Sequence, residues 1–428
     1  MEPEPIASPA WSPAQRIGFR FVFVYLILYN LPFPAGLWWD GDPLSRGYEA
    51  LWKAVVPWVG REVLRLPEPI TIFPGGSGDT TFNYVQVLCF VVLALVATVV
   101  WTALDGKRPS YDRLHCWLRV YVRLALGVTM MTYGAIKVIK SQFPSPWLAR
   151  LVQPYGDSSP MGLLWTFMGY SYPYNIFTGA GETLSGALLF FRRTTTLGAL
   201  LGCGVIGHIV VLNFAYDVPV KLFSLHLLAM AVFLLAPDAS RLVDFFLRGR
   251  AVALVPREDL FASPGRNRAA LYLRSAFFVA VAGTCFFQAW QGVHEWGEYA
   301  PRHVLHGLYD VVEFNLNGEA RPPLTSDRVR WKRLVIERPQ FVTVVLMDDS
   351  VSRFGWSADL EKKTLTLKGD EGKPPRAVLR YVQAGNELVL EGELLGSPIR
   401  TRLRKRDPAT FLLLNRGFHW VNEYPFNR

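Results

Sequence analysis

Three apolar runs between residues 170 and 238 constrain the fold of this chain more than any other feature. Very short polar links join the runs, and each run is long enough to cross the hydrocarbon core of a bilayer as a helix. Lipid offers no hydrogen-bonding partner to the backbone, so only helices and closed barrels can cross it. The stretch therefore predicts three membrane-spanning helices, which the rest of the chain must accommodate.

Further apolar runs extend this pattern to an all-α membrane bundle of about seven spans over residues 15–292. The expected spans cover residues 17–31, 84–104, 118–139, 175–191, 195–214, 219–235 and 271–291. The region 118–238 would form a four-helix core. Residues 48–66 place apolar and charged side chains on opposite sides of a helix, which predicts an interfacial helix or one folded onto the bundle. Residues 1–14 are rich in Pro and are expected to be disordered.

Composition and charge support a membrane protein rather than one that binds nucleic acid. Hydrophobic residues make up 51% of the chain, which is high for a soluble protein. The net charge is +10, but the basic residues cluster at the ends of apolar runs, so no nucleic-acid partner is expected. Most short-loop Lys and Arg follow the second, fourth and sixth spans, which predicts a cytoplasmic N-terminus. Seven spans in a bacterial inner membrane would then place the C-terminal region in the periplasm.

A change of pattern near residue 329 predicts a second domain. Seven short runs, apolar or alternating, follow between residues 330 and 404, and turn sequences such as MDDS and QAGN separate them. Strands at intervals of about 8–12 residues are typical of an antiparallel barrel or sandwich. The sequence therefore predicts a linker over 293–328 and an extracytoplasmic β domain over 329–428, which would meet a periplasmic protein or a small ligand.

Polar side chains interrupt the apolar runs at similar estimated depths. Ionisable groups inside a bilayer are costly and are candidates for function. The candidates for catalysis are Glu182, His208 and Lys221. The candidates for substrate binding are Lys137, Asn213, Asp217 and His226. The rise of a helix places them in the outer half of the bundle, with the fourth-span carboxylate roughly 10 Å deep. No metal site is expected, because the four cysteines form no CxxC pair.

The buried carboxylate is the most demanding of these groups. It needs a cation, or else it takes up a proton, and by depth the expected partners of Glu182 are Lys221 and His208. A carboxylate, an imidazole and an amine together can transfer protons in quinone redox or carbanion chemistry, and they can equally bind a small anion. The structural alternative is that these groups only satisfy one another, for example through an ion pair between Asp217 and Lys221.

Three segments between residues 118 and 238 resemble the DoxX family of four-helix membrane proteins. They are RVYVRLALGVTMMTYGAIKVI, GAGETLSGALLFFRRTTTLGALL and NFAYDVPVKLFSLHLL. The resemblance implies a membrane subunit associated with redox chemistry, in some members with quinone or thiosulfate. Quinone is therefore the candidate cofactor, and a membrane oxidoreductase or a subunit of one is the candidate enzyme class.

A looser resemblance rests on the order of the two domains. A polytopic bundle followed by an extracytoplasmic β domain is similar to vitamin-K-dependent carboxylases and their bacterial relatives. Those enzymes use a base embedded in the membrane, and the resemblance implies that role for Lys221. A third alternative is a non-enzymatic anchor or scaffold whose β domain recruits a partner.

Overall fold

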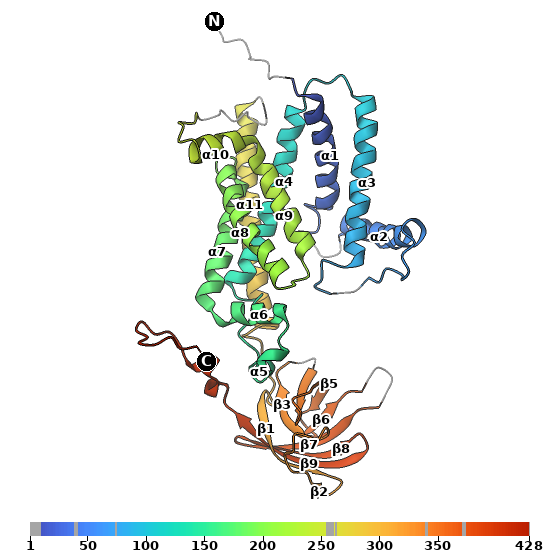
Figure 1. Ribbon diagram of the computed structural model, residues 1–428, viewed down its shortest axis with the longest axis vertical. Helices are drawn as coiled ribbons and strands as arrows, with labels where there is room; N and C mark the ends of the chain where they lie inside the picture. Colours follow the sequence, from blue (N-terminus) through green and yellow to red (C-terminus); the bar gives the residue numbers. More distant parts are fainter. Residues whose placement is uncertain are drawn as a thin grey trace. The chain divides into compact units, whose positions relative to one another are not determined.

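The chain folds into two compact units that alternate along the sequence. The computed structural model describes residues 10–37, 42–72, 75–253, 261, 263–338, 341–369 and 374–427. Residues Met1–Phe143 and Ser171–Val293 form one unit, which we call the helical unit. Residues Pro144–Tyr170 and His294–Arg428 form the other, which we call the β unit (Figure 1).

Nine α-helices build the described part of the helical unit. They are α1 (Pro13–Asn30), α2 (Pro43–Trp58), α3 (Thr81–Leu104), α4 (Asp112–Val138), α7 (Tyr172–Phe190), α8 (Thr195–Ala215), α9 (Lys221–Leu235), α10 (Ala239–Phe246) and most of α11 (Pro264–Glu295). Local sequence explains where several of them begin. Ser12 and Thr80 cap α1 and α3 in reciprocal capping boxes with the third helical residue. Of the disorder expected over 1–14, residues 1–9 lie outside the described part, and α1 already begins at Pro13.

Four segments are long and apolar enough to cross a membrane. They are α3, α8, the continuous stretch Lys221–Phe246 and α11. The described residues thus support a membrane protein, but they do not support the seven apolar spans expected from the sequence. The other three expected spans, α1, α4 and α7, are less apolar than these four segments, and Arg20, Lys137 and Glu182 are among their charged side chains. A helix that packs mainly against other helices can keep such residues, because its polar groups face protein rather than lipid.

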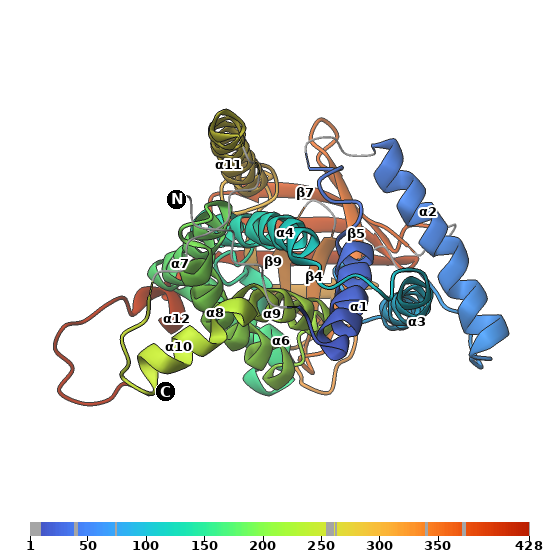
Figure 2. The ribbon, with the colours of Figure 1, turned by 90° about the horizontal axis from the view of Figure 1, so that it is seen from above.

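The helix arrangement fits that explanation. Seen from above, α4 lies between α1, α7 and α9 (Figure 2), and it packs against all three. Its Val122 and Leu126 are completely buried. By contrast, α2 lies at the edge beside α3, where its Trp52 and Val56 are buried in a small cluster. One side of the amphipathic segment predicted over residues 48–66 thus packs on α3, and its position at a membrane interface stays a prediction.

The β unit contains a closed antiparallel barrel of eight strands. These are β1 (Gly307–Leu316), β3 (Trp331–Ile336), β4 (Phe341–Leu346), β5 (Val351–Asp359), β6 (Thr364–Leu367), β7 (Ala377–Ala384), β8 (Glu387–Leu394) and β9 (Ser397–Arg406). Each strand pairs with the next, and β9 returns to pair with β1, while the short β2 (Glu319–Ala320) extends from β1. The predicted β domain is thus a barrel rather than a sandwich.

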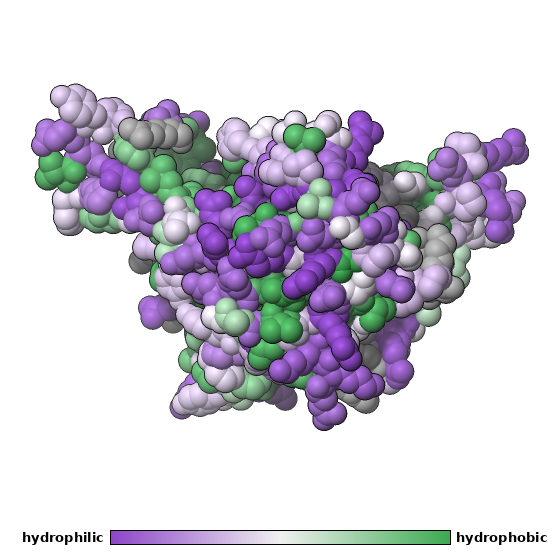
Figure 3. Space-filling view, turned by 90° about the horizontal axis from the view of Figure 1, so that it is seen from below, coloured by the Kyte–Doolittle hydropathy of each residue, from purple (hydrophilic) through white to green (hydrophobic). Residues whose placement is uncertain are grey.

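Side chains fill the barrel interior. Alternate residues of β7, such as Leu379 and Tyr381, point inward and are buried with Tyr309, Phe314 and Trp331. Small barrels of eight strands are commonly filled in this way. The face of the molecule seen from below is largely hydrophilic, with a smaller group of hydrophobic side chains near its centre (Figure 3).

Two segments of the β unit come from outside its predicted range. The expected linker, 293–328, contains β1 and β2. The second segment lies between α4 and α7 and contains α5 (Leu148–Leu151) and α6 (Pro160–Tyr170). Leu148 packs with Leu308 of β1 and Val335 of β3. A carboxylate oxygen of Glu337 accepts the backbone N–H of Leu148 at 2.7 Å.

Candidate functional site

The closest helix contact in the site region joins α4 and α7 through glycines. Gly127 and Gly134 of α4 face Gly186 and Gly179 of α7, with the same seven-residue spacing on both helices. A Cβ atom added to Gly134 would lie 2.6 Å from the backbone nitrogen of Thr183, and one added to Gly186 would lie 2.8 Å from the carbonyl oxygen of Gly127. Real side chains do not fit at such distances, so small residues allow the two backbones to touch.

An ion pair lies within this contact, beside Gly134 and Gly179. The Nζ of Lys137 donates to both carboxylate oxygens of Glu182, each at 2.7 Å. Only 1% of Glu182 and 7% of Lys137 is exposed. Removing one partner from such a pair leaves a buried charge uncompensated, which is strongly destabilising. The two side chains therefore depend on each other.

This pairing corrects the partner assignment made from the sequence. Lys221 or His208 was the expected partner of Glu182, and the structure shows that assignment to be wrong. His208 lies exposed on α8, and Lys221 binds other carboxylates. Depth along a helix was the basis of the expectation, but depth does not say toward which neighbour a side chain points.

A tyrosine completes the surroundings of the pair. Lys137 Nζ lies 5.6 Å from the centre of the Tyr133 ring, within the range of a cation–π interaction. The Tyr133 hydroxyl also lies near enough to Glu182 for an electrostatic interaction. The centre of the Tyr133 ring is also 5.9 Å from that of Phe223 in α9. A carboxylate, an amine and a phenol thus meet in the helical unit, and each can donate or accept a proton.

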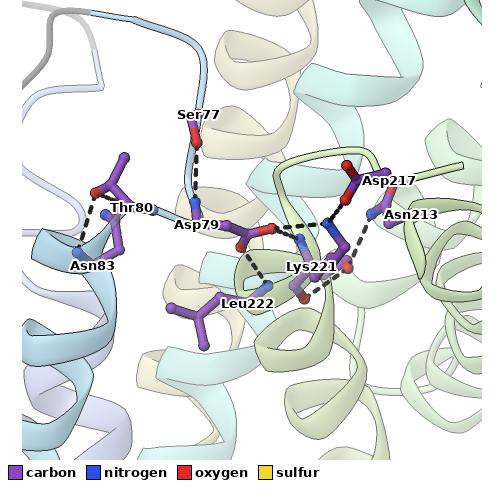
Figure 4. Close-up of polar contacts among 9 residues, drawn as sticks. Ser77, Asp79, Thr80, Asn83, Asn213, Asp217, Lys221 and Leu222 are labelled. Carbon is purple, nitrogen blue, oxygen red and sulfur yellow. Dashed lines mark hydrogen bonds and ion pairs between the residues drawn. The ribbon is translucent and has the colours of Figure 1, made fainter. Parts of the chain in front are cut away.

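A second polar group lies at the start of α9 (Figure 4). Lys221 Nζ donates to Asp217 at 2.8 Å and lies 3.9 Å from a carboxylate oxygen of Asp79. The Asp79 carboxylate also accepts the backbone N–H groups of Lys221 and Leu222, at 2.8 and 2.9 Å. Asp79 therefore caps α9 from a distant segment of chain, and its charge complements the helix dipole.

The environment of Lys221 argues against the role of an embedded base. Its ion pair with Asp217 is the one that the structural alternative predicted. The Asp217 side chain is 85% exposed, so the pair lies at the surface of the helical unit. An ammonium bonded to one carboxylate and close to another must lose a proton that both of them stabilise before it can act as a base.

The remaining candidates connect other helices. His226 Nδ1 donates to the carbonyl oxygen of Leu222 at 2.6 Å, which leaves Nε2 to accept from the Tyr25 hydroxyl at 2.5 Å. The imidazole stacks on Tyr29, with ring centres 4.0 Å apart. Asn213 donates to Ser224 at 3.0 Å and so joins α8 to α9. Neither His226 nor Asn213 binds the Lys137–Glu182 pair.

The seven candidates therefore do not form one site. They occupy four places. Lys137 and Glu182 lie at the α4–α7 interface, His226 lies at the α1–α9 contact, and His208 lies on the exposed side of α8. Asp217 and Lys221 lie at the start of α9, and Asn213 joins them through Ser224, which donates to the Lys221 carbonyl (Figure 4). In the part of the chain that the structure describes, no group of three or more His, Cys, Asp or Glu side chains is placed to hold a metal ion.

Comparison with known proteins places the chain beside one bacterial relative. No protein-family model matches the sequence, and no solved structure matches it. Over 127 residues the chain is 34% identical to the uncharacterized protein YwoB of Bacillus subtilis (strain 168), a stretch that makes up 29% of this chain and 79% of YwoB. The chain belongs to the family of YwoB. Because that relative is uncharacterized, the family relationship assigns no activity.

Four contributors to these polar groups were missed in the sequence. Tyr133 lies four residues before Lys137 on the same helix, so helical spacing could have identified it. Asp79 lies in the turn before α3, and no local pattern connects it with Lys221, more than a hundred residues later. Tyr25 and Tyr29 could not be found from a local pattern either, because only the packing of α1 against α9 brings them to the His226 imidazole.

Proposed function

We propose that the helical unit binds a small, proton-exchanging ligand of quinone size beside the Lys137–Glu182 pair, and that the protein serves redox chemistry in the membrane. The observation that carries this proposal is the burial of both charges within a unit that has four membrane-compatible segments. Ionisable side chains are expensive in such surroundings and are functional candidates by default. The resemblance to the DoxX family supports the redox association, although fold analogy alone does not assign a site.

The residues at the pair suit a ligand with carbonyl oxygens. The ammonium of Lys137 can donate a hydrogen bond to a carbonyl oxygen, and Glu182 can accept one from the hydroxyl that forms on reduction. Tyr133 adds an aromatic face against which a planar ring can pack. In this scheme the protein supplies binding and protons, whereas the electrons come from a separate reductant.

Binding of a short-chain quinone tests the proposal. Purified full-length protein would be titrated with short-chain ubiquinone and menaquinone analogues, and bound quinone would be extracted from the protein as isolated. We expect Glu182→Gln and Lys137→Met each to weaken binding at least tenfold. Lys221→Met is the matched control and should bind as the wild type does. Absence of binding by the wild type, or equal binding by all variants, would favour a non-enzymatic scaffold instead.

We also propose the finer topology. In this proposal α1, α4 and α7 cross the bilayer together with the four apolar segments, the N-terminus is cytoplasmic, and the β unit is in the periplasm of a bacterium. The distribution of Lys and Arg in the short links supports it. Cysteines introduced at Ser357 and Ser240 should be labelled from the periplasmic and the cytoplasmic side, respectively. The opposite pattern would show an inverted orientation or a different number of spans before Ser240, and either result would overturn this topology.

A further inference from the structure

The chain beyond the last barrel strand carries a dense series of exposed apolar side chains. The exposed large hydrophobic residues after β9 are Leu412, Leu413, Leu414, Phe418, Trp420, Val421, Tyr424 and Phe426. Trp420 is the extreme case, with 90% of its surface exposed. Apolar groups at this density indicate a surface that meets a partner or a membrane, whereas isolated exposed apolar residues are normal.

Strand register shows where this segment leaves the barrel. β9 pairs antiparallel with β1, and Arg406 at its end lies opposite Leu308 at the start of β1. The C-terminal segment therefore begins at the end of the barrel where the chain enters. Its first apolar residue, Phe411, packs with Leu148, Leu308 and Val335 at this end.

The chain that enters the barrel comes directly from a membrane-compatible helix. α11 ends at Glu295, and only the segment 296–306 separates it from β1. Fully extended, that segment spans at most about 40 Å. Exposed aromatic residues accompany the end of α11, namely Trp290, Trp296 and Tyr299. Trp and Tyr are enriched where a chain passes from hydrocarbon to water, so these residues indicate the level of the interface.

We infer that residues 411–427 form a peripheral membrane anchor, which inserts its aromatic side chains into the phospholipid interface of the leaflet where α11 emerges. This inference is independent of the proposed ligand site. A bilayer is the favoured occupant because the segment and α11 are joined to the same end of one barrel. Its aromatic residues also suit an interface, since the rings of Trp and Tyr combine an apolar body with a polar group.

Contacts within the segment give it a defined shape. The Arg416 guanidinium lies 4.4 Å from the centre of the Phe426 ring and donates to the side chain of Asn422 at 2.6 Å. These contacts fold the segment back on itself. The rings of Phe418 and Trp420 lie edge to face between those points, 5.1 Å apart. The fold thus brings a pair of exposed rings to one bend, where they can enter the interface together.

Quenching by lipid tests the anchor in the full-length protein. Cys116 and Cys203 would be replaced with Ser, while the buried Cys89 and Cys285 stay in place. Trp420→Cys would carry an environment-sensitive fluorophore, and the protein would be reconstituted into phosphatidylcholine vesicles with spin-labelled lipid in both leaflets. Because both leaflets contain quencher, the orientation of the protein does not affect the result.

The matched control is Val382→Cys, on the outward side of β7 and 63% exposed. We expect at least twofold stronger quenching at position 420 than at 382, together with a blue-shifted emission. Equal quenching at the two positions would overturn the inference. A blue shift at 420 without quenching by lipid would also overturn it, because the segment would then be covered by protein, such as a second copy of the chain.

Discussion

Lys137 and Lys221 form ion pairs of nearly equal length in very different surroundings. Lys137 lies 2.7 Å from Glu182, whose side chain is 2% exposed, and Lys221 lies 2.8 Å from Asp217, whose side chain is 85% exposed. Water and salt screen the second pair, so its net contribution to the free energy of unfolding is about 0–1 kcal/mol. Breaking a buried pair by removing one partner typically costs about 3–5 kcal/mol. Burial, rather than bond length, therefore determines which lysine the structure depends on.

The largest expected effect comes from breaking the buried pair on one side. Glu182→Gln or Lys137→Met should each lower the free energy of unfolding by about 3–5 kcal/mol, because each leaves its partner without compensation. The double variant should recover much of that loss. Thermal unfolding of detergent-solubilised protein measures all four members of this cycle. Strictly additive losses would mean that the two side chains do not interact, contrary to the structure.

Substitution of a glycine at the α4–α7 contact should cause the next largest loss of stability. In Gly134→Ala the new methyl group meets the backbone of Thr183 and Gly179, so the helices must separate. Overpacking of this kind typically costs about 1–3 kcal/mol. Gly204→Ala in α8 is the control, because its Cβ would meet no atom within 4 Å; by helix propensity it should stabilise by up to about 1 kcal/mol. Equal melting temperatures for the two variants would contradict the close backbone contact.

The Glu337 carboxyl of the β unit differs from Glu182 and Asp217, because it accepts hydrogen bonds from backbone N–H groups. Burial raises the pKa of Glu337 above its ordinary value of 4.5, and hydrogen bonds from Leu148 and Ala149 oppose that rise. The folded state therefore holds the proton more tightly than the unfolded state. The stability from this group is fully present below pH 4.5 and is lost as pH rises through the raised pKa.

Substitution of that carboxyl tests the sign of the pH effect. Unfolding of the wild type and of Glu337→Gln would be measured between pH 4 and pH 8. The variant cannot ionise at this position, so the stability of the wild type should fall relative to it with rising pH. A difference that is constant with pH, or that has the opposite slope, would show that burial does not dominate at Glu337.

Local patterns in the sequence predicted elements, whereas contacts between distant elements required the structure. The run beginning at Phe341 is almost continuously apolar and is followed by the turn sequence MDDS, and it forms β4 as expected. β1 lies in the range predicted as linker, and its place in the barrel depends on pairing with β9, far along the chain. The closed barrel, as opposed to a sandwich, follows from that same long-range pairing.

For the polar residues too, local pairs could be predicted from the sequence, whereas pairs between helices could not. Asp217 and Lys221 are four residues apart, and their pairing was foreseen as an alternative. Glu182 and Lys137 lie on different helices, and their pairing depends on how α4 and α7 are rotated about their axes. The glycines that fix this rotation are visible in the sequence, but which glycine faces which is not. Four of the seven expected spans are apolar enough to cross a membrane as single helices, and for α1, α4 and α7 a crossing stays a proposal.

The smallest expected effect is at the exposed pair. Asp217→Asn should change the free energy of unfolding by less than about 0.5 kcal/mol at physiological salt, because water screens the lost attraction.

Asp79→Ala should cost more, about 0.5–2 kcal/mol, since it removes the cap from two backbone N–H groups of α9. In the Asp79→Ala background, Asp217 is the remaining carboxylate bonded to Lys221, so Asp217→Asn should cost more there than in the wild type. Thermal unfolding at low and high salt measures this difference, which should shrink as salt rises. A large and salt-independent loss in the Asp217→Asn single variant would show that this pair contributes as a buried one does, and the contrast between the two lysines would then fail.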